Sequence, residues 1–140
     1  MSIGKEVYID KDVVIKQKKN SKIGDHVSID KGFYCTTKVT IGNFVHIGPY
    51  VTCIGGEKAE FISHGFNNIM AGARIIGGSD RFDDSGLFGA MIPFKYKGKQ
   101  IMKPVIMEKF SNIGTNAIIL PGSIFFSSLV KSGFSFISFV

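Results

Sequence analysis

The strongest constraint on the fold is a six-residue repeat that runs through most of the chain. An aliphatic residue opens each copy, a small or acidic residue follows, and a small or β-branched residue stands at position five. Two consecutive copies, Ile41-Gly-Asn-Phe-Val-His and Ile47-Gly-Pro-Tyr-Val-Thr, lead into Cys53. Further copies open at Ile3, Ile9, Ile15, Ile23, Ile29, Cys35, Ile69, Ile75, Met107, Ile113 and Ile119. An amphipathic helix would need apolar residues three and four positions apart, so this period favours short strands.

Short strands at this period predict a stack of triangular coils. Three repeats make one coil of roughly eighteen residues, and stacked coils bury a continuous core. Position one must point inward, because a narrow prism has room for one large side chain on each face. Glycine or aspartate at position two suits the sharp corners between faces. We therefore predict an all-β, parallel β-helix of about five to six coils.

Two interruptions break the repeat. Cys53 and Ser63 are ten residues apart rather than six, and Gly55-Gly56 mark a small bulge between them. A longer departure between Ile75 and Met107 is rich in glycine, aspartate and lysine. We expect one inserted loop here, at about residues 77–104, and loops of that length are commonly functional.

The length and the cysteines set further limits. A chain of 140 residues suits one domain, so we predict a single domain over residues 1–140. The frame places Cys35 and Cys53 one coil apart in a single inward column. Neighbouring strands are about 4.8 Å apart, so we expect two free thiols that lie close together in the core.

The charge pattern argues against several classes of partner. The net charge is +6, but the lysines are scattered, and the one cluster at Lys16, Lys18 and Lys19 is short. We expect a solvated turn there and no nucleic-acid partner. The N-terminal residues contain no apolar signal region, so we expect a cytoplasmic protein.

The last eighteen residues change composition and suggest an atypical C-terminal cap at 123–140. Phe125 takes the next inward position, with Leu129 at position five, whereas Lys131 falls where an aliphatic residue belongs and Phe126 replaces the corner glycine. We predict one distorted coil that covers the open end of the helix. This segment is too short, and too rich in serine, for a membrane span.

The repeats resemble the left-handed parallel β-helix of hexapeptide-repeat acyltransferases. The run GARIIGGSDRFDDSGLFGAMIPFKYK, with VHIGPYVTCIGG before it and KPVIMEKFSNIGTNAIILPG after it, resembles the branch that acetylates sugars for surface polysaccharides, such as lipopolysaccharide, and in nucleotide-sugar pathways. The resemblance implies acetyl-CoA or another acyl-CoA as donor. It also implies an amino or hydroxyl group of a sugar or nucleotide sugar as acceptor, and a homotrimer with active sites between subunits.

One departure from this family concerns the catalytic base. Galactoside and maltose acetyltransferases carry a His-Pro pair in the corresponding loop, where this chain has Ser79-Asp80-Arg81. That histidine therefore has no counterpart here. An amine acceptor would tolerate the change, because its own lone pair is the nucleophile.

Acyl transfer from a thioester needs a base near the acceptor and a donor for the developing oxyanion. The candidate catalytic residues are His46, His64 and Asp80. His46 lies near a corner in the VHIG stretch, and His64 stands at position two, where small residues are usual. The alternatives are ordinary surface rings for the histidines and a turn cap for Asp80. His26 lies two coils from the inserted loop and is a weaker candidate.

Two further sets of residues are candidates for binding. Arg81, Asp83 and Asp84 in the inserted loop are candidates for holding the sugar. For the donor, small residues keep the surface low enough for a pantetheine arm, and lysines can meet the CoA phosphates. These donor candidates are Gly114, Ala117, Gly122 and Lys103, with Lys131 as a further lysine. Plain coil packing is the alternative for Ala117.

Two other functions remain open. A truncated or non-catalytic trimeric β-helix assembly protein would explain the altered C-terminus. A zinc-dependent hydratase of the same fold would gather three histidines, but the spacings between His26, His46 and His64 match no ligand pattern. We therefore expect no metal.

Overall fold

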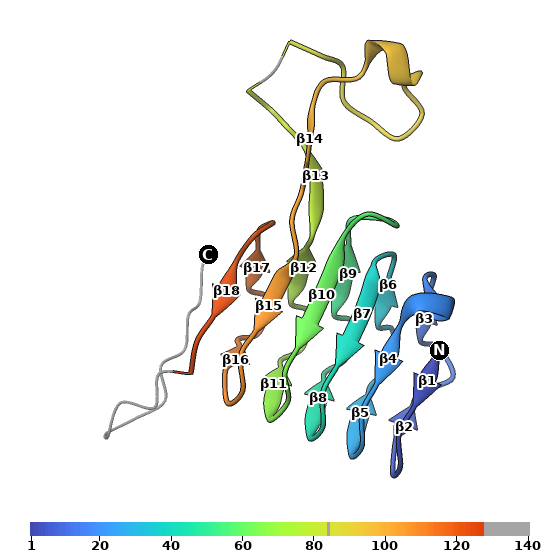
Figure 1. Ribbon diagram of the computed structural model, residues 1–140, viewed down its shortest axis with the longest axis vertical. Helices are drawn as coiled ribbons and strands as arrows, with labels where there is room; N and C mark the ends of the chain where they lie inside the picture. The colour runs from blue at the N-terminus through green and yellow to red at the C-terminus, as the bar shows by residue number, and fades with distance from the viewer. Residues whose placement is uncertain (84, 128–140) are drawn as a thin grey trace.

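The computed structural model describes residues 1–83 and 85–127, and it confirms the predicted all-β architecture. Short parallel strands stack as a β-solenoid of about six turns, with one sheet on each of three faces (Figure 1). Sheet A contains, in spatial order, β1 (Ser2–Ile3), β4 (Lys22–Ile23), β7 (Lys38–Ile41), β10 (Glu60–Ser63), β15 (Val105–Met107) and β18 (Ile124–Phe125).

In the described part of the chain, the other two faces contain five strands each. Sheet B contains β2 (Tyr8–Ile9), β5 (Val27–Ile29), β8 (Val45–Ile47), β11 (Asn67–Ile69) and β16 (Asn112–Ile113). Sheet C contains β3 (Val14–Ile15), β6 (Tyr34–Cys35), β9 (Thr52–Ile54), β12 (Arg74–Ile76) and β17 (Ile118–Ile119). A 3-10 turn, η1 (Lys18–Asn20), follows the first coil. Successive solenoid strands along the chain therefore belong to sheets A, B and C in turn, and each such set of three completes one coil.

The strand register confirms that position one points inward. Ile29, Ile47 and Ile69 stand one above another in sheet B and are fully buried. Cys35 lies directly opposite Cys53 in sheet C, and both are buried, free thiols, as predicted. The Thr37 hydroxyl lies 3.2 Å from the Cys53 sulfur. The core is thus a set of stacked side-chain columns, one for each face.

An aromatic ladder follows the corner between sheets A and B. His26, Phe44, Phe66 and Phe110 occupy position four of successive coils, and their rings stack with centroids 4.7 to 4.9 Å apart. All four have left-handed backbones, with φ between 54° and 63°. This conformation costs a non-glycine residue about 1 to 2 kcal/mol, and contacts along the ladder offset part of that cost.

The ladder predicts an inverted order of stability for two substitutions at Phe66. Both Phe66→Ala and Phe66→Gly remove the same stacked ring, but only glycine also removes the left-handed strain. We therefore expect Phe66→Gly to have a free energy of unfolding about 1 kcal/mol higher than Phe66→Ala in chemical denaturation. At Tyr34, a strand residue outside the set of left-handed residues, the order should reverse. An alanine variant at Phe66 as stable as the glycine variant would contradict this view.

The predicted loop at 77–104 is present as a projection, which we call the arm (Figure 1). At its base β13 (Gly78–Asp80) pairs antiparallel with β14 (Gln100–Met102), and Asp80 lies opposite Gln100. A 3-10 turn, η2 (Phe94–Tyr96), lies near the far end. The arm leaves the solenoid after β12 in sheet C and returns at β15 in sheet A, so it stands at the C-to-A corner.

The structure describes only residues 123–127 of the predicted C-terminal cap. Phe125 is 8% exposed and pairs with Met107, so it faces inward as expected. Leu129, Lys131 and the rest of the predicted cap after residue 127 lie outside the described residues. Among the described residues, no helix has the length and apolar character that crossing a bilayer requires.

Candidate functional site

Asp80 is held in a fixed orientation at the base of the arm. Its Oδ1 accepts a hydrogen bond from Gln100 Nε2 at 2.8 Å, and its Oδ2 accepts one from the Gly89 N–H at 3.1 Å. The Gln100 bond, then the Gly89 bond, and also the positive charge of Lys97 lower the pKa of Asp80 below its ordinary value. Asp80 is therefore an oriented carboxylate that stays ionised at neutral pH.

The predicted sugar-binding residues pair with each other. Arg81 Nε donates to Asp83 Oδ1 at 2.8 Å, and Arg81 Nη2 also bonds Asp83 Oδ2. This pairing lowers the pKa of Asp83. The third member of that prediction, Asp84, lies outside the described residues. Arg81 and Asp83 thus form a bidentate ion pair on the surface of the arm.

A groove that the sequence reasoning missed lies on the arm. Its lining residues are Lys58, Ser85, Gly86, Phe94, Lys95, Tyr96, Lys97, Gly98, Lys99, Gln100 and Met102. Gln100 joins this groove to Asp80, because the same side chain lines the groove and bonds the carboxylate. The available signal was the alternation of lysines in FKYKGK, inside a loop that was already expected to be functional.

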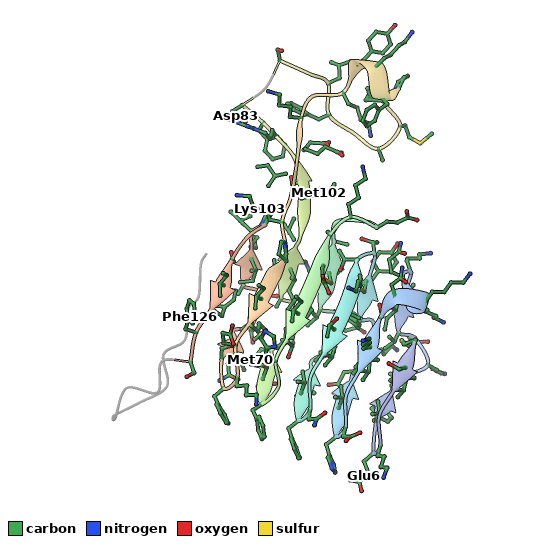
Figure 2. The ribbon with its side chains drawn as sticks, viewed as in Figure 1. Glu6, Met70, Asp83, Met102, Lys103 and Phe126 are labelled. Atoms are coloured by element: carbon green, nitrogen blue, oxygen red, sulfur yellow. The ribbon has the colours of Figure 1, made fainter. Side chains whose placement is uncertain are left out.

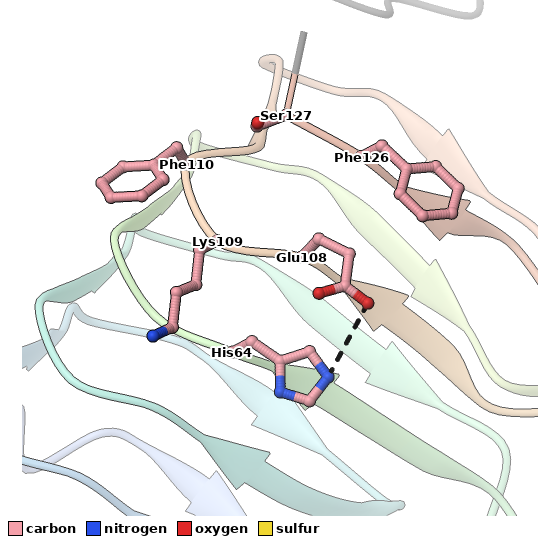
Figure 3. Close-up of a pocket in the computed structure, with 6 residues that line it drawn as sticks. All are labelled: His64, Glu108, Lys109, Phe110, Phe126 and Ser127. Atoms are coloured by element: carbon pink, nitrogen blue, oxygen red, sulfur yellow. Dashed lines mark ion pairs between the residues drawn. The ribbon is translucent and has the colours of Figure 1, made fainter. Parts of the chain in front are cut away.

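His64 forms a second candidate group with Glu108 (Figure 3). It stands at position two, where the preceding coils carry Gly24 and Gly42. Its Nε2 is 4.0 Å from Glu108 Oε1 on the next coil. Lys109, Phe110, Phe126 and Ser127 complete a shallow pocket around the pair. A half-exposed imidazole beside a carboxylate has the composition of a base with an orienting partner.

A buried asparagine supports this corner from within. Asn67 is 3% exposed, and its Nδ2 donates to the carbonyl oxygens of Glu108 at 2.8 Å and Ser111 at 2.9 Å. Its Oδ1 accepts from the Ser63 hydroxyl at 2.6 Å and from the Gly65 N–H at 3.1 Å. Asn67 therefore ties together the two turns that carry His64 and Glu108.

His46 forms a third group on the outer face of sheet B. Its Nε2 is 2.9 Å from Asp30 Oδ2, and the Ser28 hydroxyl donates to the other oxygen of Asp30 at 3.2 Å. Asn68 is the register neighbour of His46 on the next coil. The carboxylate orients the half-exposed ring through Nε2, which is the arrangement of an oriented base.

These groups do not meet within one chain. The arm precedes β15 and His64 follows β10, so Asp80 and His64 lie at opposite ends of the sheet A strands (Figure 1). His46 lies in the middle of a different sheet. A site that combined Asp80 with either histidine would need a second copy of the chain.

The predicted donor residues occupy the last coils. A Cβ built on Gly114 would meet none of the described residues within 4 Å, so the described part of the chain leaves the surface above it open. Lys103 lies at the base of the arm, near Gly122, where an added Cβ would be 2.9 Å from Lys103 Cδ (Figure 2). The side chain of Ala117 is 1% exposed and belongs to the core. Ala117 can therefore offer a ligand only its backbone, whereas Lys131 lies outside the described residues.

Each of the three histidines lies beside a different carboxylate. His26 Nδ1 pairs with Glu6 at 2.8 Å, His46 with Asp30 and His64 with Glu108. Among residues 1–83 and 85–127, no group of three His, Cys, Asp or Glu side chains is placed to hold a metal ion. The three-histidine arrangement of a hydratase is therefore not assembled by the described part of a single chain.

Comparison with solved structures finds AntD, an N-acyltransferase from Bacillus cereus. A serine-to-cysteine variant of AntD, bound to dTDP-4-amino-4,6-dideoxyglucose and coenzyme A, matches with a TM-score of 0.82 and 34% identity over 88% of this chain. AntD bound to dTDP and 3-hydroxybutyryl-CoA matches with a TM-score of 0.81 and 34% identity over 88% of this chain. An aspartate-to-asparagine variant with dTDP and coenzyme A gives a TM-score of 0.79 at 34% identity, again over 88% of this chain.

The match covers only part of AntD. The chain spans 65%, 64% and 65% of the length of these three structures. No protein-family model matches the chain, and no curated protein does. The resemblance to hexapeptide-repeat sugar acyltransferases is nevertheless confirmed, because the chain is a hexapeptide-repeat β-solenoid that has an N-acyltransferase among its structural neighbours.

Proposed function

We propose that this protein transfers an acyl group from acyl-CoA to the amino group of a nucleotide-linked amino sugar. The observation that carries the proposal is the match to AntD over 88% of the chain, in complexes that hold an amino-sugar nucleotide together with coenzyme A. We also propose that this reaction takes place in the cytoplasm, as a step in the biosynthesis of surface polysaccharides.

The proposed reaction uses Asp80 as the proton acceptor. The amine nitrogen attacks the thioester carbonyl, a C–N bond forms, and the C–S bond breaks as the coenzyme A thiolate leaves. The amine becomes strongly acidic as it bonds to carbon, so an oriented carboxylate of low pKa is basic enough to take its proton. Asp80 then passes that proton to the thiolate. Two of the AntD structures carry a substituted aspartate, and three carry a substituted serine.

His46 is the second candidate base, supported by its 2.9 Å contact with Asp30. This pair would matter most for a hydroxyl acceptor, because a hydroxyl must lose its proton to become a strong nucleophile. His64 with Glu108 has the same composition at a longer distance of 4.0 Å. We therefore propose Asp80 as the base for N-acylation, and a histidine as the base for O-acylation.

We also propose that the active unit is a homotrimer with sites between subunits. Support comes from the separation of the arm from His46 and His64 in one chain, since neighbouring copies would bring an arm against another solenoid. The open surface above Gly114 and the lysine beside Gly122 would then be the donor side of the site.

Thiol release from acyl-CoA, measured against a panel of nucleotide sugars, tests the proposal. We expect release with amino sugars and none with the matched hydroxy sugars. Release with the hydroxy sugars alone would replace N-acylation by O-acylation, and silence across the panel would contradict acyl transfer. A non-catalytic assembly would in addition show no thermal shift with coenzyme A, whereas a ligand at 100 times its Kd adds about 2.7 kcal/mol of stability.

A further inference from the structure

The two interruptions of the repeat meet at one corner and build the groove on the arm. Lys58 belongs to the bulge between β9 and β10, and the other lining residues belong to the arm. The bulge and the arm are in contact, because a Cβ on Gly78 would be 3.0 Å from the Gly55 carbonyl oxygen. Both departures from the six-residue period therefore serve the same surface.

Glycine keeps the two sides of the arm close together. A Cβ on Gly86 would lie 2.0 Å from Gly98 Cα, so this approach of backbones excludes any larger residue. The Leu87 N–H donates to the Tyr96 carbonyl at 2.9 Å, and the Gly98 N–H donates to the Leu87 carbonyl at 3.4 Å. The groove is thus a backbone-paired platform rather than a gap between loose segments.

The side chains on this platform are cationic and aromatic. Lys58, Lys95, Lys97 and Lys99 line the groove, and no carboxylate stands among its lining residues in the described part of the chain. Phe94 is 84% exposed and Tyr96 is 54% exposed, and Lys95 Nζ lies 4.8 Å from the centre of the Tyr96 ring. Clustered lysines repel one another, so they favour a multiply charged anion, and exposed rings favour a flat partner that can stack.

A nucleoside diphosphate has both properties, with a base to stack and a diphosphate for the lysines. We propose that this groove binds the nucleoside diphosphate portion of a substrate. The inference deepens the proposed function and rests on it for the reacting end of the substrate. Because Gln100 lines the groove and bonds Asp80, a nucleotide bound here would lie next to that carboxylate.

Two substrates of the proposed reaction contain a nucleotide with a diphosphate, namely the nucleotide sugar and coenzyme A. Binding of dTDP and of coenzyme A to the purified full chain, measured separately by calorimetry, distinguishes them. The groove variant is Lys58→Ala/Lys95→Ala/Lys97→Ala. Its matched control is Lys18→Ala/Lys19→Ala/Lys22→Ala, which removes the same charge from exposed positions near η1, in the early coils.

We expect the groove variant to weaken binding of one nucleotide by about tenfold or more, and the control variant to change it less than about twofold. Loss for dTDP alone assigns the groove to the acceptor, and loss for coenzyme A alone assigns it to the donor. A third variant, with arginine at the same three groove positions, should retain binding because it keeps the charge. Equal binding by wild type, groove variant and control would overturn the inference.

The same variants separate this inference from the proposed function. If wild type transfers acyl groups while the groove variant binds both nucleotides normally, the groove inference fails and the function stands. If the groove variant loses dTDP binding but wild type acylates no amino sugar, the function fails and the groove stands. If wild type binds neither nucleotide, the groove inference is overturned directly.

Discussion

Replacing Asn67 by alanine should lower the free energy of unfolding by about 3 kcal/mol or more. The side chain is buried and bonds the Ser63 hydroxyl, the Gly65 N–H and the carbonyls of Glu108 and Ser111. Alanine removes all of these hydrogen bonds at once, and each buried partner group that is left unpaired costs about 1 to 3 kcal/mol. Urea denaturation, followed by circular dichroism, measures the loss.

The adjacent residue provides the matched control. Asn68 has the same side chain on the same strand, but its Oδ1 is buried without a hydrogen-bond partner among the described residues. Asn68→Ala therefore removes an unsatisfied acceptor, and we expect it to lower stability by less than about 1 kcal/mol. Similar losses for Asn67→Ala and Asn68→Ala would show that the network is not what holds this corner.

Replacing Asp80 by asparagine should reduce kcat for N-acylation by about 100-fold or more, with a KM within about threefold of wild type. Asparagine retains the shape and an acceptor oxygen for the Gln100 bond, but it cannot take a proton, and a positioned base contributes about 100- to 10,000-fold. Steady-state kinetics on the folded variant measure both constants. Asp12→Asn, in the first coil, is the control and should leave both constants unchanged.

The pKa of Asp80 adds a pH signature to this prediction. Its hydrogen bonds with Gln100 and Gly89 hold the pKa below the ordinary value of 3.8, so the carboxylate is already ionised throughout pH 5 to 8. Asp80 therefore imposes no loss of rate as pH falls through this range. A loss of about 100-fold or more in kcat for His46→Asn, with Asp80→Asn close to wild type, would assign the base to His46 instead.

The repeat made the core predictable residue by residue. A period of six fixes which side chains share a column, so the inward isoleucines and the Cys35–Cys53 contact followed directly from spacing. The same frame explains a weaker prediction, because position five also points inward and therefore places the Ala117 side chain in the core rather than in a donor groove. The His46–Asp30 pair had a signal too, since the two lie one coil apart near the same corner.

The spatial arrangement of the candidate site residues was less predictable from the sequence. The period says nothing about where an insertion projects, so sequence alone did not show that the arm and His64 lie at opposite ends of sheet A. The lysine groove depends on Gly86 packing against Gly98 and on a bulge of the preceding coil, which are contacts between segments outside the repeat. Such contacts depend on backbone geometry and leave only a weak signal in the amino-acid sequence.

The central claim is that the protein forms an amide on a nucleotide-linked amino sugar. The most direct measurement is the mass of the product after incubation of dTDP-4-amino-4,6-dideoxyglucose with acetyl-CoA or 3-hydroxybutyryl-CoA, before and after hydroxylamine, which cleaves esters and spares amides. We predict a mass gain of one acyl group that survives hydroxylamine. No gain with either donor, or a gain that hydroxylamine removes, would contradict the account.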